Sequence, residues 1–350
     1  MSAPAQPIKL PASAAMLQVI QGFWVSRAIC VVAELGIADL LKDGPMKSEV
    51  LALAAGAHAP SVFRLMRALA SVGVFVEDNR KRFALTPLGD TLRSDVPGSL
   101  RLFAAEVLGR NQYAAWEQLL YAVKTGATAF DHVFGVSRWQ CNAEHPKEAT
   151  SFDEAMASFN SIVASAVLNS YDFSSCGKVV DIGGGNASLL AAILKVHPSL
   201  RGVLADLPHV LDGAQRRLTA ENVAERCEVV GADFFKSVPE GDTYLLKWII
   251  HDWDDERAQV ILKNCAAAMN PGGRVLLVES IVKSRNGCSL AEFMDLAMLV
   301  MTGGRERTEP EYQALLGRAG LRITNVISTG TELSLIESKT SKRPLIHVYP

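Results

Sequence analysis

The sequence predicts an α/β protein in which a mainly parallel sheet, covered by helices on both faces, follows a smaller helical domain. Two observations support this division. From Lys178 onward, short apolar runs alternate with helical stretches, the pattern of strands and helices in a parallel sheet. Before Lys178 the apolar residues follow helical spacing, interrupted by one short pair of extended runs. A chain of 350 residues is also longer than one typical domain.

The composition indicates a packed, soluble protein. Hydrophobic residues make up 49% and charged residues 21% of the chain, which excludes a disordered protein. Glu34, Asp39 and Lys42 interrupt the apolar region near the start, so we expect no membrane-spanning segment and no membrane partner. The N-terminus lacks the basic and then apolar order of a secretion signal. We therefore expect a cytoplasmic protein.

The six cysteines lie far apart in the sequence, without the close pairs of a zinc site or a redox motif. We expect reduced thiols in apolar surroundings rather than disulfides or a metal site. They are Cys30, Cys141, Cys176, Cys227, Cys265 and Cys288.

The N-terminal part predicts three helices and a strand pair. Apolar residues at helical spacing place the helices over residues 16–41, over 47–55 and after the Ala-Pro-Ser segment at 59–61. The third helix carries Val62, Met66 and Leu69 on one face. Two extended runs, 74–76 and 82–85, then flank a turn. This order predicts a winged helix.

A winged helix often binds DNA, but the charges of this domain favour another role. The third helix carries only two basic residues, Arg64 and Arg67. The run Arg80-Lys81-Arg82 lies beside Glu77 and Asp78, and the whole chain has a formal net charge of −2. This is too little positive charge to follow a phosphate backbone. We expect the domain to form a homodimer, and we expect no nucleic acid partner.

Residues 101–170 are expected to form a helical connector to the sheet. The sequence there is helical in pattern and rich in aromatic residues. Such aromatics belong either to a hydrophobic core or to a ligand pocket, and both interpretations stay open. The aromatics include Phe103, Tyr113, Trp116, Phe152 and Phe159.

Seven strands are expected in residues 171–350. Helices fit the connections between the first five strands, including one over 254–269 that begins with three acidic residues and ends at a Pro-Gly-Gly turn. The expected strands cover residues 178–182, 202–205, 227–230, 244–250, 275–279, 321–326 and 333–336.

A glycine turn follows the first of these strands. Glycines at Gly183 to Gly185 let a ligand approach the backbone closely and place it over the N-terminus of the next helix. Ser188 stands where a dinucleotide-binding turn needs glycine or alanine, which argues against NAD. The second strand ends in Asp206, at the distance expected of a carboxylate that accepts both ribose hydroxyls.

The third strand end adds Asp233, a candidate acceptor for an adenine amino group, with Phe234 beside it. Open α/β sheets bind ligands at the carboxyl ends of their strands. Gly183, Asp206 and Asp233 follow three successive strands, so together they predict a ligand that contains adenosine.

The fourth strand leads into His251, which follows a strand end and could accept a proton near the ligand. Two carboxylates come from later segments: Glu279 ends the fifth strand, and Glu306 lies in the segment Gly303–Thr308. Either of them could hold the imidazole ring and stabilise its charged form.

These motifs resemble the small-molecule O-methyltransferases, the family of the plant caffeate and acetylserotonin enzymes and of bacterial antibiotic-tailoring enzymes. The resemblance covers nearly the whole chain. It implies a Rossmann-like class I methyltransferase sheet at residues 171–350, a winged-helix dimerisation domain at 1–100, and a connector at 101–170 that contributes to the substrate pocket. It rests on Asp181–Gly185, Asp206–Val210, Gly231–Phe235, Lys247–Glu256 and Gly303–Thr308.

The resemblance also implies residue roles. S-adenosylmethionine would be the cofactor without any metal, His251 would be the catalytic base, and Glu279 and Glu306 would lie beside it. The implied cofactor contacts are Gly183, Asp206, Asp233, Phe234, Lys247 and Trp253. The implied substrate contacts are Met156, Asp252, Met294 and Met298. The last two belong to a methionine stripe, completed by Met301, that packing alone explains equally well.

We therefore expect a methyl group to pass from S-adenosylmethionine to a hydroxyl, expected to be phenolic, of a small aromatic natural product such as an antibiotic precursor. The transfer would be a base-assisted in-line displacement that leaves S-adenosylhomocysteine. Three alternatives stay open. The first is a ligand-sensing winged-helix regulator, which has no need of the His251 cluster. The second is a nicotinamide oxidoreductase, which fits the glycine turn poorly. The third is a methyltransferase that acts on nitrogen or carbon, which would keep the same fold.

Overall fold

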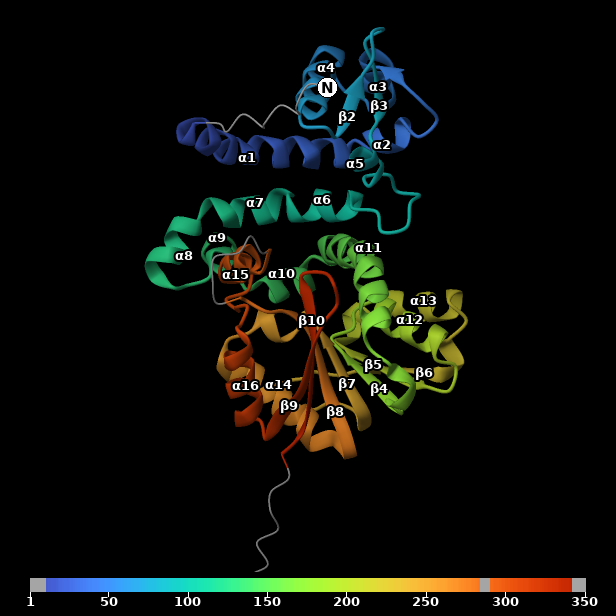
Figure 1. The fold of residues 1–350 in the computed structure, drawn as a ribbon, viewed down its shortest axis with the longest axis vertical. Coiled ribbons are helices and arrows are strands. Elements are labelled where there is room, and N and C mark those ends of the chain that lie inside the picture. The colour runs from blue at the N-terminus through green and yellow to red at the C-terminus, as the bar shows by residue number, and fades with distance from the viewer. Residues whose placement is uncertain (1–10, 284–289, 342–350) are drawn as a thin grey trace, which may run out of the picture. The chain divides into compact units, whose positions relative to one another are not determined.

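The computed structural model describes residues 11–283 and 290–341 (Figure 1). The chain divides into two compact units, one up to Arg110 and one from Asn111 onward. Helix α6 (Arg101–Val107) therefore lies in the first unit. The sequence analysis divided the chain by expected role into a dimerisation domain, a connector and a sheet domain, with boundaries at residues 100 and 170. The two compact units do not test this division, so it stays a prediction.

The first unit consists of helices and a three-stranded sheet in which β3 pairs antiparallel with both β1 and β2. The predicted helices and strand pair are present. Strand β1 was missed because two residues are too few to show a period. The first predicted helix is divided at Gly36, which has a φ of 63°. The helices are α1 (Ala12–Glu34), α2 (Ile37–Leu40), α3 (Ser48–Ala54), α4 (Ala59–Ser71), α5 (Pro87–Asp90) and α6, and the strands are β1 (Met46–Lys47), β2 (Phe75–Glu77) and β3 (Arg82–Leu85).

The core of the first unit is built on α4. Val62, Met66 and Leu69 lie on one face of this helix and are buried, as predicted from their spacing. Phe75 and Phe83 from the strand pair pack in the same cluster. The helical face and the wing therefore share one hydrophobic core.

The first half of α1 exposes a band of apolar side chains. Six large ones are 55–74% exposed, and the only charged residues within α1 are Arg27 and Glu34. By length and composition α1 could cross a membrane, with a mean hydropathy of 1.5 over a window that is 11% buried. Glu34 is the last residue of α1 and does not interrupt it, and the expectation of no membrane-spanning segment stays a prediction. The exposed side chains are Met16, Leu17, Val19, Ile20, Phe23 and Trp24.

The second unit is built on a seven-stranded sheet in the order β6-β5-β4-β7-β8-β10-β9 (Figure 1). Strands β4 to β8 are parallel, whereas β10 pairs antiparallel with β8 and β9. All seven predicted strands are present, so the mainly parallel sheet is confirmed. They are β4 (Lys178–Ile182), β5 (Arg201–Asp206), β6 (Cys227–Gly231), β7 (Gly241–Lys247), β8 (Met269–Ser280), β9 (Leu321–Ser328) and β10 (Leu333–Thr340).

Strand β7 ends earlier than predicted. The expected strand reaches Ile250, but β7 ends at Lys247 because Trp248 has a φ of 54°. A non-glycine residue in this left-handed conformation ends an extended backbone. The chain then enters the short 3₁₀ helix η4 (Ile250–Asp252), which carries His251.

Helices occupy three of the four connections between the first five strands. The fourth, residues 232–240, joins β6 to β7 as a loop, and the helix expected there was wrong because this connection is too short for one. The helices of the second unit are α7 (Arg110–Glu117), α8 (Leu119–Thr125), α9 (Ala129–Phe134), α10 (Arg138–Glu144), α11 (Pro146–Ser170), η1 (Phe173–Ser175), α12 (Ser188–Val196), η2 (Pro208–Gly213), α13 (Ala214–Ala220), η3 (Ala224–Arg226), η4, α14 (Asp255–Ala268), α15 (Leu290–Met301) and α16 (Glu309–Arg318).

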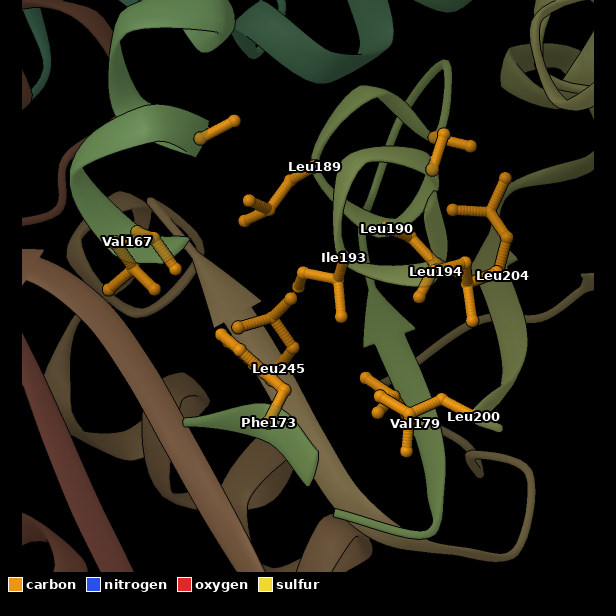
Figure 2. Close-up of a cluster of buried hydrophobic side chains, with 14 of the residues drawn as sticks. Val167, Phe173, Val179, Leu189, Leu190, Ile193, Leu194, Leu200, Leu204 and Leu245 are labelled. Atoms are coloured by element: carbon orange, nitrogen blue, oxygen red, sulfur yellow. The ribbon is translucent and has the colours of Figure 1, made fainter. Parts of the chain in front are cut away.

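Strand β4 is buried on both faces. Val179 packs with Leu190 and Leu194 of α12 in the cluster shown in Figure 2. Val180 packs in a second cluster, which includes Ile261 of α14. A slip of one residue would exchange these two faces, so the register of β4 is strongly fixed. The residues that follow β4 therefore begin from a fixed position.

The five cysteines within the described ranges are buried free thiols, as predicted. Burial raises the pKa of Cys265 to about 12, so this thiol is protonated and unreactive at neutral pH. Cys288 lies outside the described residues.

Candidate active site

The glycine turn joins β4 to the N-terminus of α12. Gly183 has a φ of 65°, and its N–H donates to the carbonyl oxygen of Ala205 at 2.8 Å. A Cβ atom at Gly183 would lie 2.5 Å from Cδ1 of Ile249, so a side chain there would meet both strain and crowding. The turn therefore keeps its backbone open to a ligand at the carboxyl end of the sheet.

Asp206, at the end of β5, is tied to this turn. Its Oδ2 accepts a hydrogen bond of 2.9 Å from the N–H of Gly185, and its Oδ1 accepts one of 2.7 Å from the N–H of Leu207. Burial raises the pKa of Asp206, and these two N–H donors oppose the rise. The first two predicted strand ends thus lie together, with a carboxylate held in a fixed orientation.

Asp233 is the second residue of the loop after β6, and two aromatic residues follow it. Its Oδ1 accepts from the N–H of Phe235 at 3.0 Å, and its Oδ2 lies 3.1 Å from Nζ of Lys236. The rings of Phe234 and Phe235 meet Trp253 edge-to-face, with centroids 6.1 and 4.8 Å away. The predicted neighbours of adenine therefore form one aromatic cluster.

Trp139 on α10 belongs to the same cluster and was missed by the sequence analysis. Its ring centroid lies 6.0 Å from that of Trp253. Its Nε1 is buried and has no hydrogen-bond partner among the described residues. No motif surrounds Trp139 in the sequence, so only the fold reveals this contact.

Asp181 lies next to Gly184 of the glycine turn, and it interacts electrostatically with half-buried Lys247 at the end of β7. Asp181 of β4 is 2% exposed, and burial raises its pKa to about 7. Burial lowers the pKa of Lys247 to about 8, while Asp181, Glu279 and Asp252 act against this change. Nζ of Lys247 also lies 4.4 Å from the ring centre of Trp248. Oδ2 of Asp181 lacks a hydrogen-bond partner within the described part of the chain.

His251 lies on η4 and is 5% exposed. Its Nδ1 is 2.7 Å from Oε1 of Glu306 and 3.7 Å from Oε2 of Glu279. Its Nε2 is 3.8 Å from Oδ1 of Asp252. The structure therefore brings together the three residues predicted as a catalytic set, and it places Glu306 within hydrogen-bonding distance of the ring.

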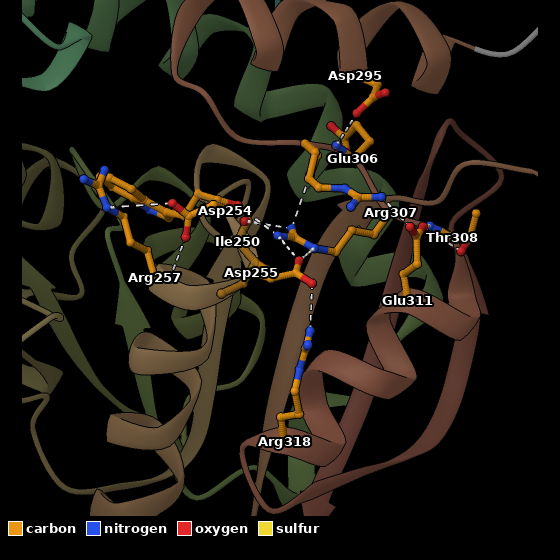
Figure 3. Close-up of polar contacts among 12 residues, drawn as sticks. Ile250, Asp254, Asp255, Arg257, Asp295, Glu306, Arg307, Thr308, Glu311 and Arg318 are labelled. Carbon is orange, nitrogen blue, oxygen red and sulfur yellow. Dashed lines mark hydrogen bonds and ion pairs between the residues drawn. The ribbon is translucent and has the colours of Figure 1, made fainter. Parts of the chain in front are cut away.

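The two glutamates have different surroundings. Oε1 of Glu279 accepts from the N–H of Ile250 at 2.9 Å, which leaves only its Oε2 facing the imidazole. The N–H of Glu306 donates to Oδ1 of Asp295 at 2.9 Å (Figure 3). Both side chains are fully buried. The sequence left open which carboxylate holds His251, and the distances favour Glu306.

Burial shifts the protonation of this cluster. It raises the pKa of Glu279 and of Asp252 to about 7 and that of Glu306 to about 8, and neighbouring carboxylates add to each rise. When Glu306 is ionised it accepts the Nδ1 proton, which leaves the lone pair of Nε2 free to accept a proton from a ligand.

Ligand atoms of His251, Glu279 and Glu306 lie within 4.8 Å of one another, so geometry alone would allow them to hold a metal ion. The sequence analysis predicted these three residues as a base with two carboxylates beside it and expected no metal ion; it did not note that the same set has the geometry to hold one.

The residues predicted to contact a substrate come from three elements. Asp252 lies on η4, Met156 on α11, and Met294 and Met298 on α15. Met298 is 9% exposed, whereas Met156 and Met294 are partly exposed. Met301 packs in a core cluster with Phe130, so packing accounts for this member of the stripe.

Arg307 is fully buried and was given no role by the sequence analysis. Its guanidinium contacts the backbone on both sides of His251 and pairs with Asp255 of α14 (Figure 3). The sequence offers no signal for this position, because an arginine in a polar loop is usually exposed.

Comparison with protein families gives two matches. The O-methyltransferase domain matches residues 116–322, and the O-methyltransferase dimerisation domain matches residues 17–95. The second match supports a homodimer.

Similar proteins include the phenazine O-methyltransferase PhzM of Lysobacter antibioticus, 43% identical over 94% of this chain and 97% of that protein. The mitomycin biosynthesis 6-O-methyltransferase of Streptomyces lavendulae is 41% identical over 89% of this chain and 90% of that protein. The phenazine-1-carboxylate N-methyltransferase of Pseudomonas aeruginosa is 34% identical over 93% and 97%.

Solved structures show the same fold. The structure of LaPhzM has a TM-score of 0.91 at 43% identity and covers 95% of this chain and 100% of that chain. Human N-acetylserotonin methyltransferase in complex with S-adenosylmethionine has a TM-score of 0.89 at 27% identity, covering 96% and 100%. The O-methyltransferase NcsB1, with S-adenosylmethionine and 2-hydroxy-5-methyl naphthoic acid, has a TM-score of 0.77 at 33% identity, covering 90% and 96%.

Proposed function

Because the chain belongs to the O-methyltransferase family, with both its catalytic and its dimerisation domain, we propose that it methylates a hydroxyl group, phenolic in character, on a small aromatic natural product. The observation that carries this proposal is the contact of 2.7 Å between Nδ1 of His251 and Oε1 of Glu306. It orients a buried base at the carboxyl edge of the sheet, and a hydroxyl acceptor needs such a base.

S-adenosylmethionine is the methyl donor in this family, and solved relatives hold this molecule or S-adenosylhomocysteine. The residues of this chain fit it. Gly183 leaves room at the turn, Asp206 offers a fixed carboxylate for the ribose, and Oδ2 of Asp181 is a buried acceptor still to be satisfied. When bound, the cofactor supplies an electrophilic methyl group on a cationic sulfur.

We assign the cofactor contacts to the turn, the strand ends and the aromatic cluster. Asp206 would accept the ribose hydroxyls, and Asp233 would accept from the adenine amino group beside Phe234 and Trp253. Lys247 would lie beneath the turn with Asp181, where its charge balances the buried carboxylates. These contacts, together with Gly183, make up the proposed cofactor site.

His251 would accept the proton of the acceptor hydroxyl at Nε2. A free phenol has a pKa near about 10 and an imidazole near about 6.5, so complete transfer in advance would be uphill by roughly 5 kcal/mol. Transfer during methyl attack avoids most of this cost, and the carboxylates of Glu306 and Glu279 stabilise the imidazolium that forms. Neither step requires a metal ion.

An oxygen acceptor fits this base better than a nitrogen acceptor does. Relatives include the phenazine-1-carboxylate N-methyltransferase, so the family also works on nitrogen. An aromatic ring nitrogen attacks through a lone pair that carries no proton, and a base next to it contributes little. The oriented His251 therefore favours a hydroxyl. We propose that Asp252, Met156, Met294 and Met298 contact the aromatic acceptor, as Asp252 lies 3.8 Å from Nε2.

We also propose that the homodimer forms through the first unit and that the enzyme works in the cytoplasm. Apart from Met16, the exposed apolar band on α1 lies within the matched dimerisation domain, which supports an interface there. A net charge of −2 gives no general attraction for nucleic acid.

The proposed function is tested by incubating the enzyme with S-adenosylmethionine and a panel of phenols, hydroxyphenazines and matched aromatic amines. Mass spectrometry counts the methyl groups transferred, and NMR locates them. We expect O-methylated products from at least one hydroxyl acceptor. Exclusive methylation of nitrogen, or binding of NAD instead of S-adenosylmethionine, would overturn the proposal. A duplex DNA binding assay tests the regulator alternative, for which we expect no binding.

A further inference from the structure

The short helix η4, which carries His251, is held in place by hydrogen bonds from another segment of the chain. Its own hydrogen bonds are long, since the N–H groups of Asp252 and Trp253 lie 3.3 Å from the carbonyl oxygens of Ile249 and Ile250. Shorter contacts come from the segment that also carries Glu306. The N–H of Arg305 donates to the carbonyl oxygen of His251 at 2.8 Å.

The side chain of Arg307 completes this support (Figure 3). Nη1 donates to the carbonyl oxygens of Ile250 at 3.1 Å and Arg305 at 3.2 Å, and Nη2 donates to that of Trp253 at 2.9 Å. Nε and Nη2 both bind Oδ1 of Asp255, at 3.0 and 2.9 Å. These contacts use all the N–H donors of a guanidinium, which a lysine ammonium could not reproduce.

The segment around Arg307 is itself anchored. The carbonyl oxygen of Arg307 accepts from the N–H of Val282, just beyond the strand that carries Glu279. Thr308 begins α16 with a capping box completed by Glu311. The other oxygen of Asp255 binds Nη2 of Arg318, at the end of α16, at 2.7 Å. One connected set of contacts therefore holds the backbone around His251 and the segments that carry Glu279 and Glu306, both of which face Nδ1.

From this geometry we infer that Arg307 is a positioning residue for the base: it fixes the backbone before and after His251, so that Nδ1 stays on Glu306 and Nε2 faces the acceptor. The inference rests on the proposed function, because it gives His251 the role of base. A displacement of about 1 Å in a reacting group can cost about 10²-fold in rate. Arg307 acts at a distance from the acceptor, through the position of His251.

The test uses the full-length enzyme with two forms of one accepted phenol. The parent has an ordinary phenolic pKa, and a ring-halogenated derivative is already ionised at the assay pH. Arg307→Lys should lower kcat on the parent phenol by about 10- to 100-fold and should leave kcat on the ionised derivative within about twofold of wild type. The KM for the acceptor and the affinity for S-adenosylmethionine should change little.

The chain offers a matched control in Arg226. Its guanidinium likewise donates to three backbone carbonyl oxygens, those of His197, Leu200 and Leu194, and it lies outside the proposed site. Arg226→Lys should lower the melting temperature. It should not change kcat on the parent phenol relative to kcat on the ionised derivative. If Arg307→Lys fails to fold, Asp255→Asn, which weakens the hold on Arg307 from a side chain that is 40% exposed, should show the same selective loss at smaller size.

The possible outcomes distinguish a failure of the positioning role of Arg307 from a failure of the proposed function. Equal losses on both acceptors, or no loss on either, in a folded Arg307→Lys or Asp255→Asn enzyme overturn the positioning role. A wild-type enzyme that methylates no phenol, or a His251→Ala enzyme that keeps full activity on the parent phenol, instead overturns the proposed function.

Discussion

The carboxylate of Asp206 accepts a hydrogen bond of 2.9 Å from the backbone N–H of Gly185, which joins the end of β5 to the turn after β4. This contact sets the carboxylate before any ligand arrives. A ribose bound there would add two hydrogen bonds to an oriented acceptor without the entropy cost of ordering it.

Asp206→Ala should therefore weaken cofactor binding. Removing two charge-assisted hydrogen bonds, each worth about 1.5–3 kcal/mol, predicts at least roughly a tenfold loss of affinity for S-adenosylmethionine. Isothermal titration calorimetry measures this directly. Lys195→Ala is a suitable control, since this lysine is 65% exposed and pairs with Glu221, outside the proposed site. Unchanged affinity in Asp206→Ala would falsify the assignment of the ribose site.

His251→Ala should lower kcat by about 10²–10⁴ and leave the affinity for S-adenosylmethionine nearly intact. Part of the lost rate should return at high pH, where the phenol ionises by itself. Steady-state kinetics between pH 6 and 10, combined with calorimetry, check both points. Loss of cofactor binding would instead identify His251 as structural, and full turnover at neutral pH would mean that the acceptor needs no base.

Gly304→Ala should displace the turn that carries His251. A Cβ atom at Gly304 would overlap the carbonyl oxygen of His251, and backbone atoms of Asp252 and Trp253 crowd the same space. We expect kcat on an ordinary phenol to fall at least tenfold, along with a lower melting temperature. Gly317→Ala is the control, because its Cβ would point into open space on α16 and should raise stability by up to about 1 kcal/mol. Wild-type kcat in Gly304→Ala would contradict the crowding argument.

Stability should fall as the pH rises above about 4.5. Burial raises the pKa of Glu279 from 4.5 to about 7 and that of Glu306 from 4.5 to about 8, so the folded enzyme holds protons that the unfolded chain releases. The free energy of unfolding is then highest below the unfolded pKa and declines as the pH rises through the folded pKa.

Urea unfolding of the cofactor-free enzyme between pH 5 and 8 measures this slope. Glu306→Gln removes one of the titrating carboxyls and should flatten the decline. The pKa values of Asp181 and Asp252 are also raised, so these two carboxyls likewise lower the free energy of unfolding as the pH rises. Lys247 affects the free energy of unfolding only above about pH 8. A free energy of unfolding that increases across this range would show that these carboxyls are ionised in the folded enzyme.

The apolar band on α1 should be the dimer interface. Trp24 and Ile20 are 64% and 61% exposed, more than a stable monomer is expected to leave open in one continuous band. Ile20→Glu should convert the dimer to a monomer with lower activity, as seen by light scattering and kinetics. Leu53→Glu, at an 85% exposed position on α3, should leave the dimer intact. Deleting α1 should give insoluble or inactive protein, and a soluble, fully active monomer would disprove the interface.

The sequence predicted the sheet well because its signals are local. Strand β4 was predicted with its observed bounds, since a short apolar run between polar turns leaves few choices. The end of β7 was wrong because the left-handed conformation of Trp248 depends on packing that no sequence period reports. The helix expected between β6 and β7 failed for a different reason: the strand pattern was right, and the connection was too short.

The site was predicted at the level of residue types rather than contacts. His251, Glu279 and Glu306 come from separate elements, so their meeting follows from the order of the strands. The choice between the two glutamates depends on differences of about one ångström in position, which only the fold provides. Arg307 was overlooked because its role is to bind backbone oxygens, and these leave no trace in the sequence.

The exposed apolar band on α1 has a consequence for how the enzyme is made. If α1 must be covered by a second copy, the last step of folding is a collision between two chains, and its rate depends on the square of their concentration. Newly made chains at low copy number would then spend longer with this band open to chaperones and to aggregation. The apparent melting temperature should rise with protein concentration, and refolding after dilution should slow in proportion.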